Sequence, residues 1–239
     1  MQVQLNRRFT KGLQFGGSWT WSKSMDYVSN DFAAVADVVP IKIWNYGKSD
    51  FDRTHVVQVN WVWDVPAASK LVKNKVVSAV GDHWQLSGIA SFISGAPSGI
   101  GLSTTTGLDI PGGGDGARPL VLSDPIIPKG DRTLLHYFNT SAFALPAIGT
   151  AGNAPRDVVR GPGTNNFDMT IFKNFPIRER ANFQLRFEAY NAFNHTQFSS
   201  MNTTAQFNPA TGQQVNAAFG TLTAARGSRV GQASLRFSF

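Results

Sequence analysis

Hydrophobic and polar residues alternate along the last segment of the chain, residues 229–239. One parity carries Gly231, Ala233, Leu235, Phe237 and Phe239, and the other carries Gln232, Ser234, Arg236 and Ser238. Because successive side chains of a strand point to opposite faces, this segment is predicted to be a β-strand with one apolar and one polar face. The apolar parity runs to the final residue, so the chain ends on an aromatic side chain.

The same alternation recurs and predicts six further strands. In the clearest run, residues 13–22, the apolar parity holds Leu13, Phe15, Trp19 and Trp21. The predicted strands cover residues 2–6, 13–22, 57–65, 84–92, 165–175, 181–193 and 229–239. Strands of about ten residues match the length of a tilted strand that crosses a membrane.

The connections between these strands alternate between short and long. Polar or tight turns are predicted at 7–12 and 176–180, a Lys-rich link at 67–82, and long connections at 23–53, 95–164 and 194–228. Outer-membrane barrels have short periplasmic turns and long extracellular loops, so this rule puts the C-terminus in the periplasm. The sequence therefore predicts an all-β fold, an antiparallel transmembrane β-barrel portion of about seven strands with long extracellular loops.

Tryptophan positions are compatible with this prediction. Five of the six tryptophans lie on the apolar parity of a predicted strand, namely Trp19, Trp21, Trp61, Trp63 and Trp84. The first two fall near the proposed extracellular end and the others near the proposed periplasmic end, where barrels carry aromatic girdles. A β-sandwich core would use the same parity, but it would bury the indoles, whose N–H groups would then need partners.

Composition narrows the function classes. Charged residues make up 15% of the chain and aromatic residues 12%, there is no cysteine, and the formal charge is +7. The absence of cysteine excludes a disulfide scaffold and a Cys-ligated metal site. The basic residues are scattered without a Lys/Arg block, which argues against nucleic-acid binding. No apolar run reaches the roughly 18 residues of a transmembrane helix.

Motifs for catalysis, metals or cofactors are not found. The histidines His55, His83, His136 and His195 lack metal-like spacing and are interpreted as rim or hydrogen-bonding residues. The glycine-rich segment 111–116 lacks the Lys-Ser/Thr of a phosphate loop and is predicted to be a flexible loop tip. The segment 160–163 (RGPG) is either the base of a substrate-contacting loop or, as we favour, a turn in which glycine supplies positive φ. We expect no enzyme activity.

Four charged residues fall on the polar parity of the last three strands, which would face the lumen of a barrel. They are Asp168, Arg186, Glu188 and Arg236. Buried charges need partners, either across strands or on a plug domain. Because the sixth and seventh strands could be neighbours, Glu188 with Arg236 is the preferred predicted pair.

With these segments identified, the chain resembles the C-terminal part of a TonB-dependent receptor of the Oar-like type. The matching stretches, in the family's order, are TWSKSMD (20–26), FDRTHVVQVNWVWDVP (51–66), WQLSGIASFISGAP (84–97), YFNTSAFALPAIGTAGNAPRDVVRGPGTNNFDMTIFKNFPI (137–177), FQLRFEAYNAFNHTQF (183–198) and SLRFSF (234–239). Each stretch alone is moderate evidence, whereas the ordered set covers most of the chain.

The resemblance implies an outer-membrane barrel of about 22 strands with a separate plug domain inside it. It implies uptake of a large or scarce nutrient, driven through the TonB complex, which would contact only the plug. On this interpretation residues 1–239 are a C-terminal barrel segment, and the plug domain and N-terminal strands are absent. The partners implied are outer-membrane lipid, the missing strands and plug, and the barrel assembly machinery, whose recognition signal Phe239 resembles.

A second interpretation is a soluble or surface-attached all-β module that binds carbohydrate or acts as an adhesin. It would require a closed hydrophobic core and tryptophans on an exposed binding face. Neither interpretation identifies a substrate, because specificity would reside in the long loops and in plug residues outside this chain.

Overall fold

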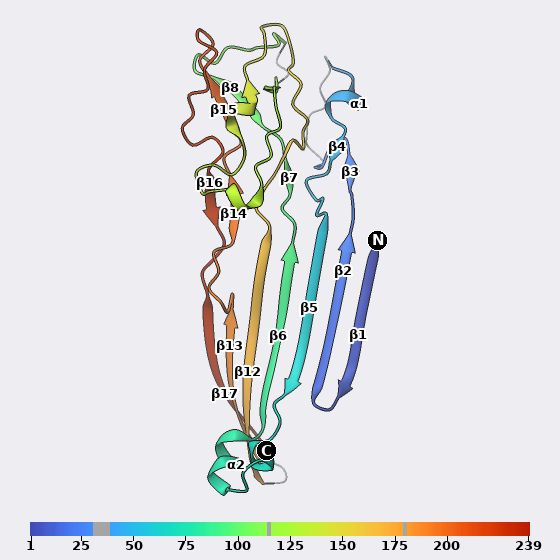
Figure 1. Cartoon of the computed structure of the whole chain (residues 1–239), viewed down its shortest axis with the longest axis vertical. Helices are drawn as coiled ribbons and strands as arrows, with labels where there is room; N and C mark the ends of the chain where they lie inside the picture. The colour runs from blue at the N-terminus through green and yellow to red at the C-terminus, as the bar shows by residue number, and fades with distance from the viewer. Residues whose placement is uncertain (31–38, 114–115, 179–180) are drawn as a thin grey trace.

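The computed structural model of this protein describes residues 1–30, 39–113, 116–178 and 181–239. Seven long strands form one antiparallel sheet, and strands that follow each other in the chain are also neighbours in the sheet (Figure 1). They are β1 (Gln2–Thr10), β2 (Leu13–Trp21), β5 (His55–Asp64), β6 (Trp84–Ile93), β12 (Thr164–Arg178), β13 (Ala181–Tyr190) and β17 (Val230–Ser238). All seven predicted strands are therefore confirmed.

Two predicted turns are displaced. Strand β1 continues through residues 7–10, and the turn is reduced to Lys11 and Gly12, with φ of 53° and 79°. Two successive residues with positive φ suit the twist of a two-residue hairpin, which explains why the strand runs further than alternation indicated. At the other predicted turn, β12 extends to Arg178, and residues 179–180 lie outside the described part of the chain.

The register keeps the apolar positions of all seven strands on one face. Val57 of β5 lies opposite Trp19 of β2 and Phe92 of β6, and Leu185 of β13 lies opposite Leu235 of β17. Residues directly opposite in an antiparallel pair point to the same side of the sheet. The sheet therefore has one mainly apolar face and one mainly polar face, the latter interrupted by Val62, Ile89 and Phe172.

The packed hydrophobic core lies in the connections at one end of the sheet. Phe138, Phe143 and Phe219 pack edge to face, with ring centroids 5.2–6.0 Å apart. The same cluster holds Ile100, Ala142, Val159, Ala205 and Phe207. Within the described residues no second sheet packs on the seven-stranded sheet, so the β-sandwich core considered for the tryptophans is not found.

We call this cluster and the connections around it the head; among the described residues it comprises 22–30, 39–54, 94–113, 116–163 and 191–229 (Figure 1). Its short elements pair with one another in two-stranded sheets, including the parallel pair β8–β15 that joins two different connections. The elements of the head are β3 (Met25–Asp26), α1 (Ile41–Trp44), β4 (Gly47–Lys48), β7 (Pro97–Ser98), β8 (Gly101–Thr104), β9 (Leu120–Val121), η2 (Lys129–Asp131), η3 (Thr140–Ala142), β10 (Phe143–Ala144), β11 (Val159–Arg160), β14 (Phe198–Met201), β15 (Thr204–Phe207) and β16 (Leu222–Ala225).

The link between β5 and β6, at the opposite end of the sheet, contains two helical segments that alternation did not predict. They are η1 (Ala68–Lys70) and α2 (Lys75–Gly81), and we call residues 65–83 the foot. Asn74 caps α2, because its side-chain oxygen accepts a hydrogen bond from the Val76 amide at 2.8 Å. In the described ranges, no helix has the length and apolar character needed to cross a membrane.

Candidate functional site: the polar sheet face and the head

The polar face of the sheet is lined by amide and hydroxyl side chains that can donate and accept hydrogen bonds. One shallow hollow on it is bordered by Gln4, Asn6, Ser18, Gln58 and Asn60, from β1, β2 and β5. A second hollow, further along the same face, is bordered by Asn60, Asp168, Thr170, Glu188 and Tyr190. A polar molecule that moves along this face would meet hydrogen-bonding groups on strands from both halves of the sheet.

The charged residues predicted for this face lie on it, but the preferred pair is wrong. Glu188 lies opposite Gln232 in the register, and Arg236 lies opposite Gln184, so the two charges are four residues apart along the strands. Glu188 instead forms an ion pair with Arg186 of its own strand. The prediction that β13 and β17 are neighbours is correct, whereas their register could not be obtained from alternation alone.

Asp168 and Arg186 have local roles on this face. The Asp168 carboxylate accepts hydrogen bonds from the Asn191 amide and the Asn166 side chain, both at 2.9 Å, and so holds the turn that follows β13. The Arg186 guanidinium lies over the ring of Phe172, 4.9 Å from its centroid. Both groups therefore have protein partners on this face.

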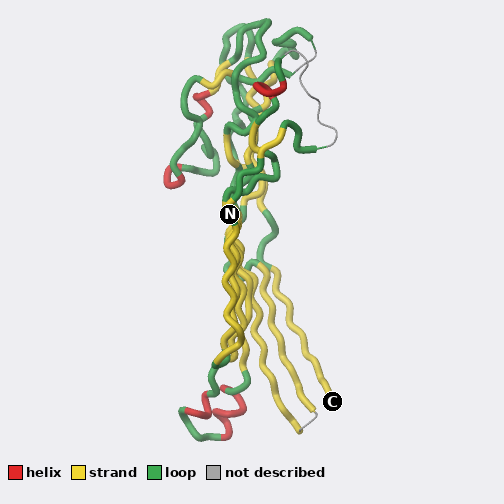
Figure 2. The backbone as a smooth tube through the Cα atoms, turned by 90° about the vertical axis from the view of Figure 1, so that its right-hand side faces the viewer, coloured by secondary structure: helices red, strands yellow, loops and turns green. Residues whose placement is uncertain are grey.

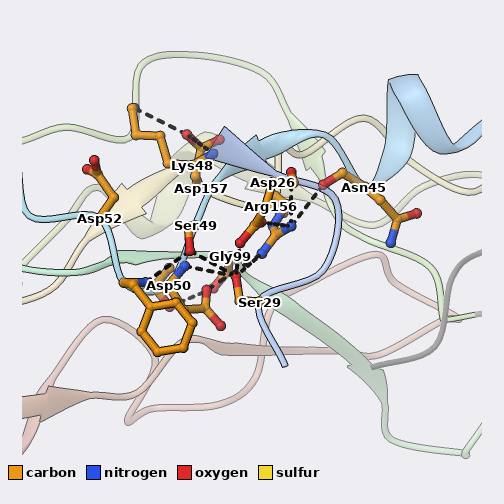
Figure 3. Close-up of polar contacts among 12 residues, drawn as sticks. Asp26, Ser29, Asn45, Lys48, Ser49, Asp50, Asp52, Gly99, Arg156 and Asp157 are labelled. Carbon is orange, nitrogen blue, oxygen red and sulfur yellow. Dashed lines mark hydrogen bonds and ion pairs between the residues drawn. The ribbon is translucent and has the colours of Figure 1, made fainter. Parts of the chain in front are cut away.

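Arg156 is the centre of a polar network that joins the first two long connections of the head (Figure 3). Its Nη1 donates to Asp26 Oδ1 at 2.8 Å and to the Asn45 carbonyl at 3.0 Å, and its Nη2 donates to Ser29 Oγ at 2.7 Å. The planar guanidinium can serve several acceptors in fixed directions, which a lysine cannot do. Arg156 therefore fastens the β2–β5 connection to the β6–β12 connection.

Two further ion pairs lie beside this network. Lys48 Nζ is 3.2 Å from Asp157 Oδ2, and Arg160 Nη2 is 2.5 Å from Asp52 Oδ2. Asp52 is buried, and burial alone would raise its pKa. The hydrogen bonds from Arg160 and the Ser24 amide, together with the positive charge of Arg160, reverse that effect and hold the pKa of Asp52 below its ordinary value. The carboxylate is therefore ionised and bound.

Arg160 begins the RGPG segment, for which the sequence left two interpretations open. Arg160 is the last residue of β11 and also donates to the Gly95 carbonyl at 2.8 Å, so it acts as a clamp within the head. The expectation of positive φ is wrong, because neither Gly161 nor Gly163 has it. Gly163 is needed for close approach instead, since a Cβ there would lie 2.7 Å from the Ile93 carbonyl oxygen.

The structure also places the histidines and the glycine-rich segment, for which the sequence predicted no metal or phosphate site. The residues that the structure describes contain no group of three or more side chains that could hold a metal ion. His55 and His195 line one hollow beneath the head, together with Lys129, Arg132 and Tyr137. Residues 114–115 of the glycine-rich segment lie outside the described ranges, and the neighbouring Gly112 and Gly113 have no contacts around their Cβ positions.

The hollow that contains His55 and His195 was not found from the sequence. Val57, Phe92 and Asn165 also line it, and all three belong to the apolar parity of the sheet. The hollow is therefore at the end of the apolar face, next to Trp19, whose indole donates to His55 Nδ1 at 3.2 Å. His55 is therefore a hydrogen-bonding residue at the start of β5, which agrees with its interpretation as a rim or hydrogen-bonding residue.

Comparison with known families agrees with this geometry. A family model described as "Outer membrane beta barrel domain" matches residues 1–232. The chain belongs to this family. The match ends inside β17, so residues 233–239 lie outside it. No match is found among curated proteins or among solved structures.

Because the chain belongs to this family, the environment of each face of the sheet can be assigned. In a transmembrane barrel the apolar parity faces lipid and the polar parity faces the lumen. Ten strand residues at about 3.4 Å each, tilted by about 40°, span roughly the 25 Å apolar band of an outer-membrane barrel. Trp19 and Trp21 lie at the head end of this band, and Trp61, Trp63 and Trp84 lie toward the foot, as predicted for aromatic girdles.

Proposed function

We propose that this outer-membrane domain forms part of the wall and the outer loops of a TonB-dependent transporter, which takes up a large or scarce nutrient. The observation that carries the proposal is the head, which is packed and fastened by ion pairs at one end of a polar sheet face. A packed head offers a preorganised surface for capture, and the polar face beneath it offers hydrogen bonds along a path inward. The ordered resemblance to TonB-dependent receptors supports the energy-coupled form of uptake.

The sheet has features that a larger barrel would complete. In the described residues β1 and β17 each pair on one side only, and an open strand edge beside a lipid-facing surface is an aggregation hazard. We propose that further strands of the same barrel pair with β1 and β17, and that a plug domain contacts the polar face at Arg186 and Glu188. The chain would then be the C-terminal barrel segment, and TonB would act on the plug.

The mechanism proposed is passage without catalysis and without a cofactor. The head binds the nutrient, the plug rearranges when TonB engages it, and the nutrient moves along the lumen wall. Lys48, Arg156 and Arg160 are charged, but ion pairs hold them in the head. They would shape the capture surface by holding the loops, and no reacting group is required of them.

Uptake by cells that carry the intact protein tests this function. Growth or radiolabel uptake is measured on glycans, iron chelates and peptides, with and without a functional TonB complex. We expect one class to bind in both strains and to be taken up only when TonB is functional. Uptake that is equal in both strains would contradict the proposal, as would the absence of any bound class.

A matched pair of variants links that uptake to the head. Arg156→Lys removes the multiple hydrogen bonds that join the two connections, and we expect weaker nutrient binding. Arg226→Lys changes an exposed arginine elsewhere in the head and should leave binding unchanged. Equal nutrient binding by both variants would show that the Arg156 network does not contribute to nutrient capture.

We also propose that Phe239 is read by the barrel assembly machinery. Its side chain is 93% exposed at the end of the chain, beyond β17. Phe239→Ala should lower the amount of barrel in the outer membrane, whereas Ser238→Ala should not. Quantitative immunoblotting of outer-membrane fractions measures this, and equal amounts for the two variants would exclude the role.

A further inference from the structure

The foot is held against the lipid-facing side of the sheet by specific contacts. The Trp84 indole donates to the Val80 carbonyl at 2.7 Å, and the Lys173 ammonium donates to the Asp82 carbonyl. Lys173 lies on the apolar parity of β12, yet only 2% of it is exposed, and its ammonium lies 5.4 Å from the centroid of the Trp84 ring. Figure 2 places the foot on one side of the sheet, while the lower ends of the last strands curve toward the other.

Internal hydrogen bonds give the foot a defined shape. The Asp82 carboxylate accepts from the Ser69 amide at 2.9 Å and from the Ser78 hydroxyl at 2.7 Å, so it ties η1 to α2. The two segments also approach closely, because a Cβ at Gly81 would lie 2.6 Å from the Ala68 Cβ. These contacts hold Ser69, Ser78 and Asp82 against one another and leave the large apolar side chains of the foot outside.

Four large apolar side chains of the foot are exposed. Leu71 is 89% exposed, Val76 70%, Val80 64% and Val72 54%. Val76 and Val80 are one helical turn apart and so lie on one side of α2. The Val80 carbonyl also accepts the hydrogen bond of the Trp84 indole, so this apolar surface lies next to the lipid-facing side of the sheet.

The same segment is basic. Residues 65–83 contain Lys70, Lys73 and Lys75 against the single acidic residue Asp82. No described residue forms an ion pair with any of the three lysines, whereas Asp82 is already bound by Ser69 and Ser78. Apolar side chains with flanking lysines are the composition of a segment that lies in a membrane interface and binds anionic lipid.

We propose that the foot is an interfacial anchor that docks on the periplasmic leaflet of the outer membrane. Leu71, Val76 and Val80 would enter the boundary between headgroups and acyl chains. The three lysines would contact the phosphates of anionic phospholipids. The end of a barrel that carries the short connections is periplasmic. We therefore infer the periplasmic leaflet from the position of the foot at that end, and not from the composition of the foot. This inference goes beyond nutrient uptake and does not depend on the transported substrate.

Because the chain contains no cysteine, a single introduced thiol gives a unique labelling position in it. We would attach a nitroxide to Val76→Cys and, separately, to Val80→Cys in the intact protein in lipid vesicles. Collisions with oxygen report lipid contact, and collisions with a water-soluble nickel chelate report water contact. Both valines are exposed, so the substitutions should leave the fold intact.

Three control positions define the scale. Leu86→Cys, on the lipid-facing parity of β6, gives the value for a residue in lipid. Lys11→Cys, in the hairpin turn at the same end of the sheet, gives the value for periplasmic water. Ile148→Cys, which replaces an apolar side chain of the head that is 74% exposed, shows what apolar exposure alone produces.

We expect the oxygen-to-nickel ratio at Val76→Cys and Val80→Cys to approach that of Leu86→Cys and to exceed that of Lys11→Cys several-fold. A ratio equal to those of Lys11→Cys and Ile148→Cys would overturn the proposal, because the foot would then lie in water. Protection from both reagents would overturn it as well, because a protein partner would then cover the foot.

The charge requirement has its own test. Vesicles of phosphatidylethanolamine alone are compared with vesicles that also contain phosphatidylglycerol. We expect phosphatidylglycerol to move the Val76→Cys label deeper into the lipid. Each lysine should raise the ratio of lipid-bound to water-exposed foot about fivefold. Substitution of Lys70, Lys73 and Lys75 by glutamine should abolish this response, and Lys11→Gln should retain it. A response that is the same in the triple variant would refute the role of the lysines.

Discussion

Arg160 and Asp52 lie 108 residues apart in the chain, yet their side chains form an ion pair with an Nη2 to Oδ2 distance of 2.5 Å. Asp52 is 1% exposed, and Arg160 also reaches the Gly95 carbonyl. The pair therefore connects two long loops at the point where both leave the sheet. Together with Arg156 it explains how residues without regular structure can form a defined head.

Asp52→Asn should loosen the head. The asparagine retains the size and can still accept the Ser24 hydrogen bond, but it leaves the Arg160 guanidinium without its counter-charge. Removing one partner of a buried ion pair lowers the free energy of unfolding by about 3 kcal/mol at the lower end of the usual range. We expect this lower value because Arg160 is partly exposed. Thermal unfolding and protease cleavage within residues 22–54 measure the change.

Asp50→Asn is the control for that variant. The Asp50 carboxylate is 66% exposed and lies 3.8 Å from Arg156, so its loss should cost less than about 1 kcal/mol. If both variants unfold at the same temperature as the unmodified protein, the Asp52 pair does not hold the head.

Val59→Arg and Asn60→Arg compare the two faces of the sheet at adjacent positions of β5. Val59 is on the apolar parity and Asn60 on the polar parity. An arginine near the lipid midplane of a barrel costs about 2–4 kcal/mol, whereas the lumen side tolerates it. Unfolding in denaturant from lipid vesicles should show this loss for Val59→Arg only. The opposite order would mean that the faces are assigned the wrong way round.

Alternation was sufficient to predict the sheet because the direction of a strand side chain depends only on its own position. Leu185 and Leu235 illustrate this, since each was placed on the apolar parity separately and the two lie opposite each other in the structure. Register is a relation between two strands, and for this reason Glu188 could be assigned to the correct face but not to its correct partner, Arg186.

The head and the foot could not be predicted in the same way. Arg156 meets Asp26 across 130 residues, and nothing in either local sequence indicates the contact. The foot did carry a local signal, because Asn74 is a good N-cap and Val76 and Val80 have helical spacing. Because α2 has only seven residues, its helical period is too short to stand out beside the alternation of the flanking strands.

Lys173→Met should release the foot from β12. The methionine retains apolar bulk on the lipid-facing parity, but it cannot donate to the Asp82 carbonyl. A hydrogen bond from a charged donor contributes about 1.5–3 kcal/mol, so amide hydrogens of α2 should exchange roughly tenfold faster or more. Hydrogen exchange followed by mass spectrometry measures this.

Lys11→Met is the matched control, since Lys11 is an exposed lysine in the turn between β1 and β2. It should change exchange in neither α2 nor β12. Faster exchange across the whole sheet in Lys173→Met would show that the lysine supports the barrel wall itself, and would contradict a role limited to the foot.

Asp82 should make the foot sensitive to acid. Hydrogen bonds from the Ser69 side chain and amide, and then from Ser78, lower the pKa of Asp82 from 3.8 to about 2. A carboxylate whose pKa is depressed in the folded state stabilises that state fully above its unfolded pKa, and the contribution is lost as the pH falls through the folded pKa. We therefore expect α2 to be ordered above about pH 4 and to loosen progressively toward about pH 2. A nitroxide at Val76→Cys would report this as increased mobility. In Asp82→Asn the acid transition should disappear, because no group at that position titrates, and a transition that persists in that variant, or one centred near neutral pH, would exclude the Asp82 carboxylate as its cause.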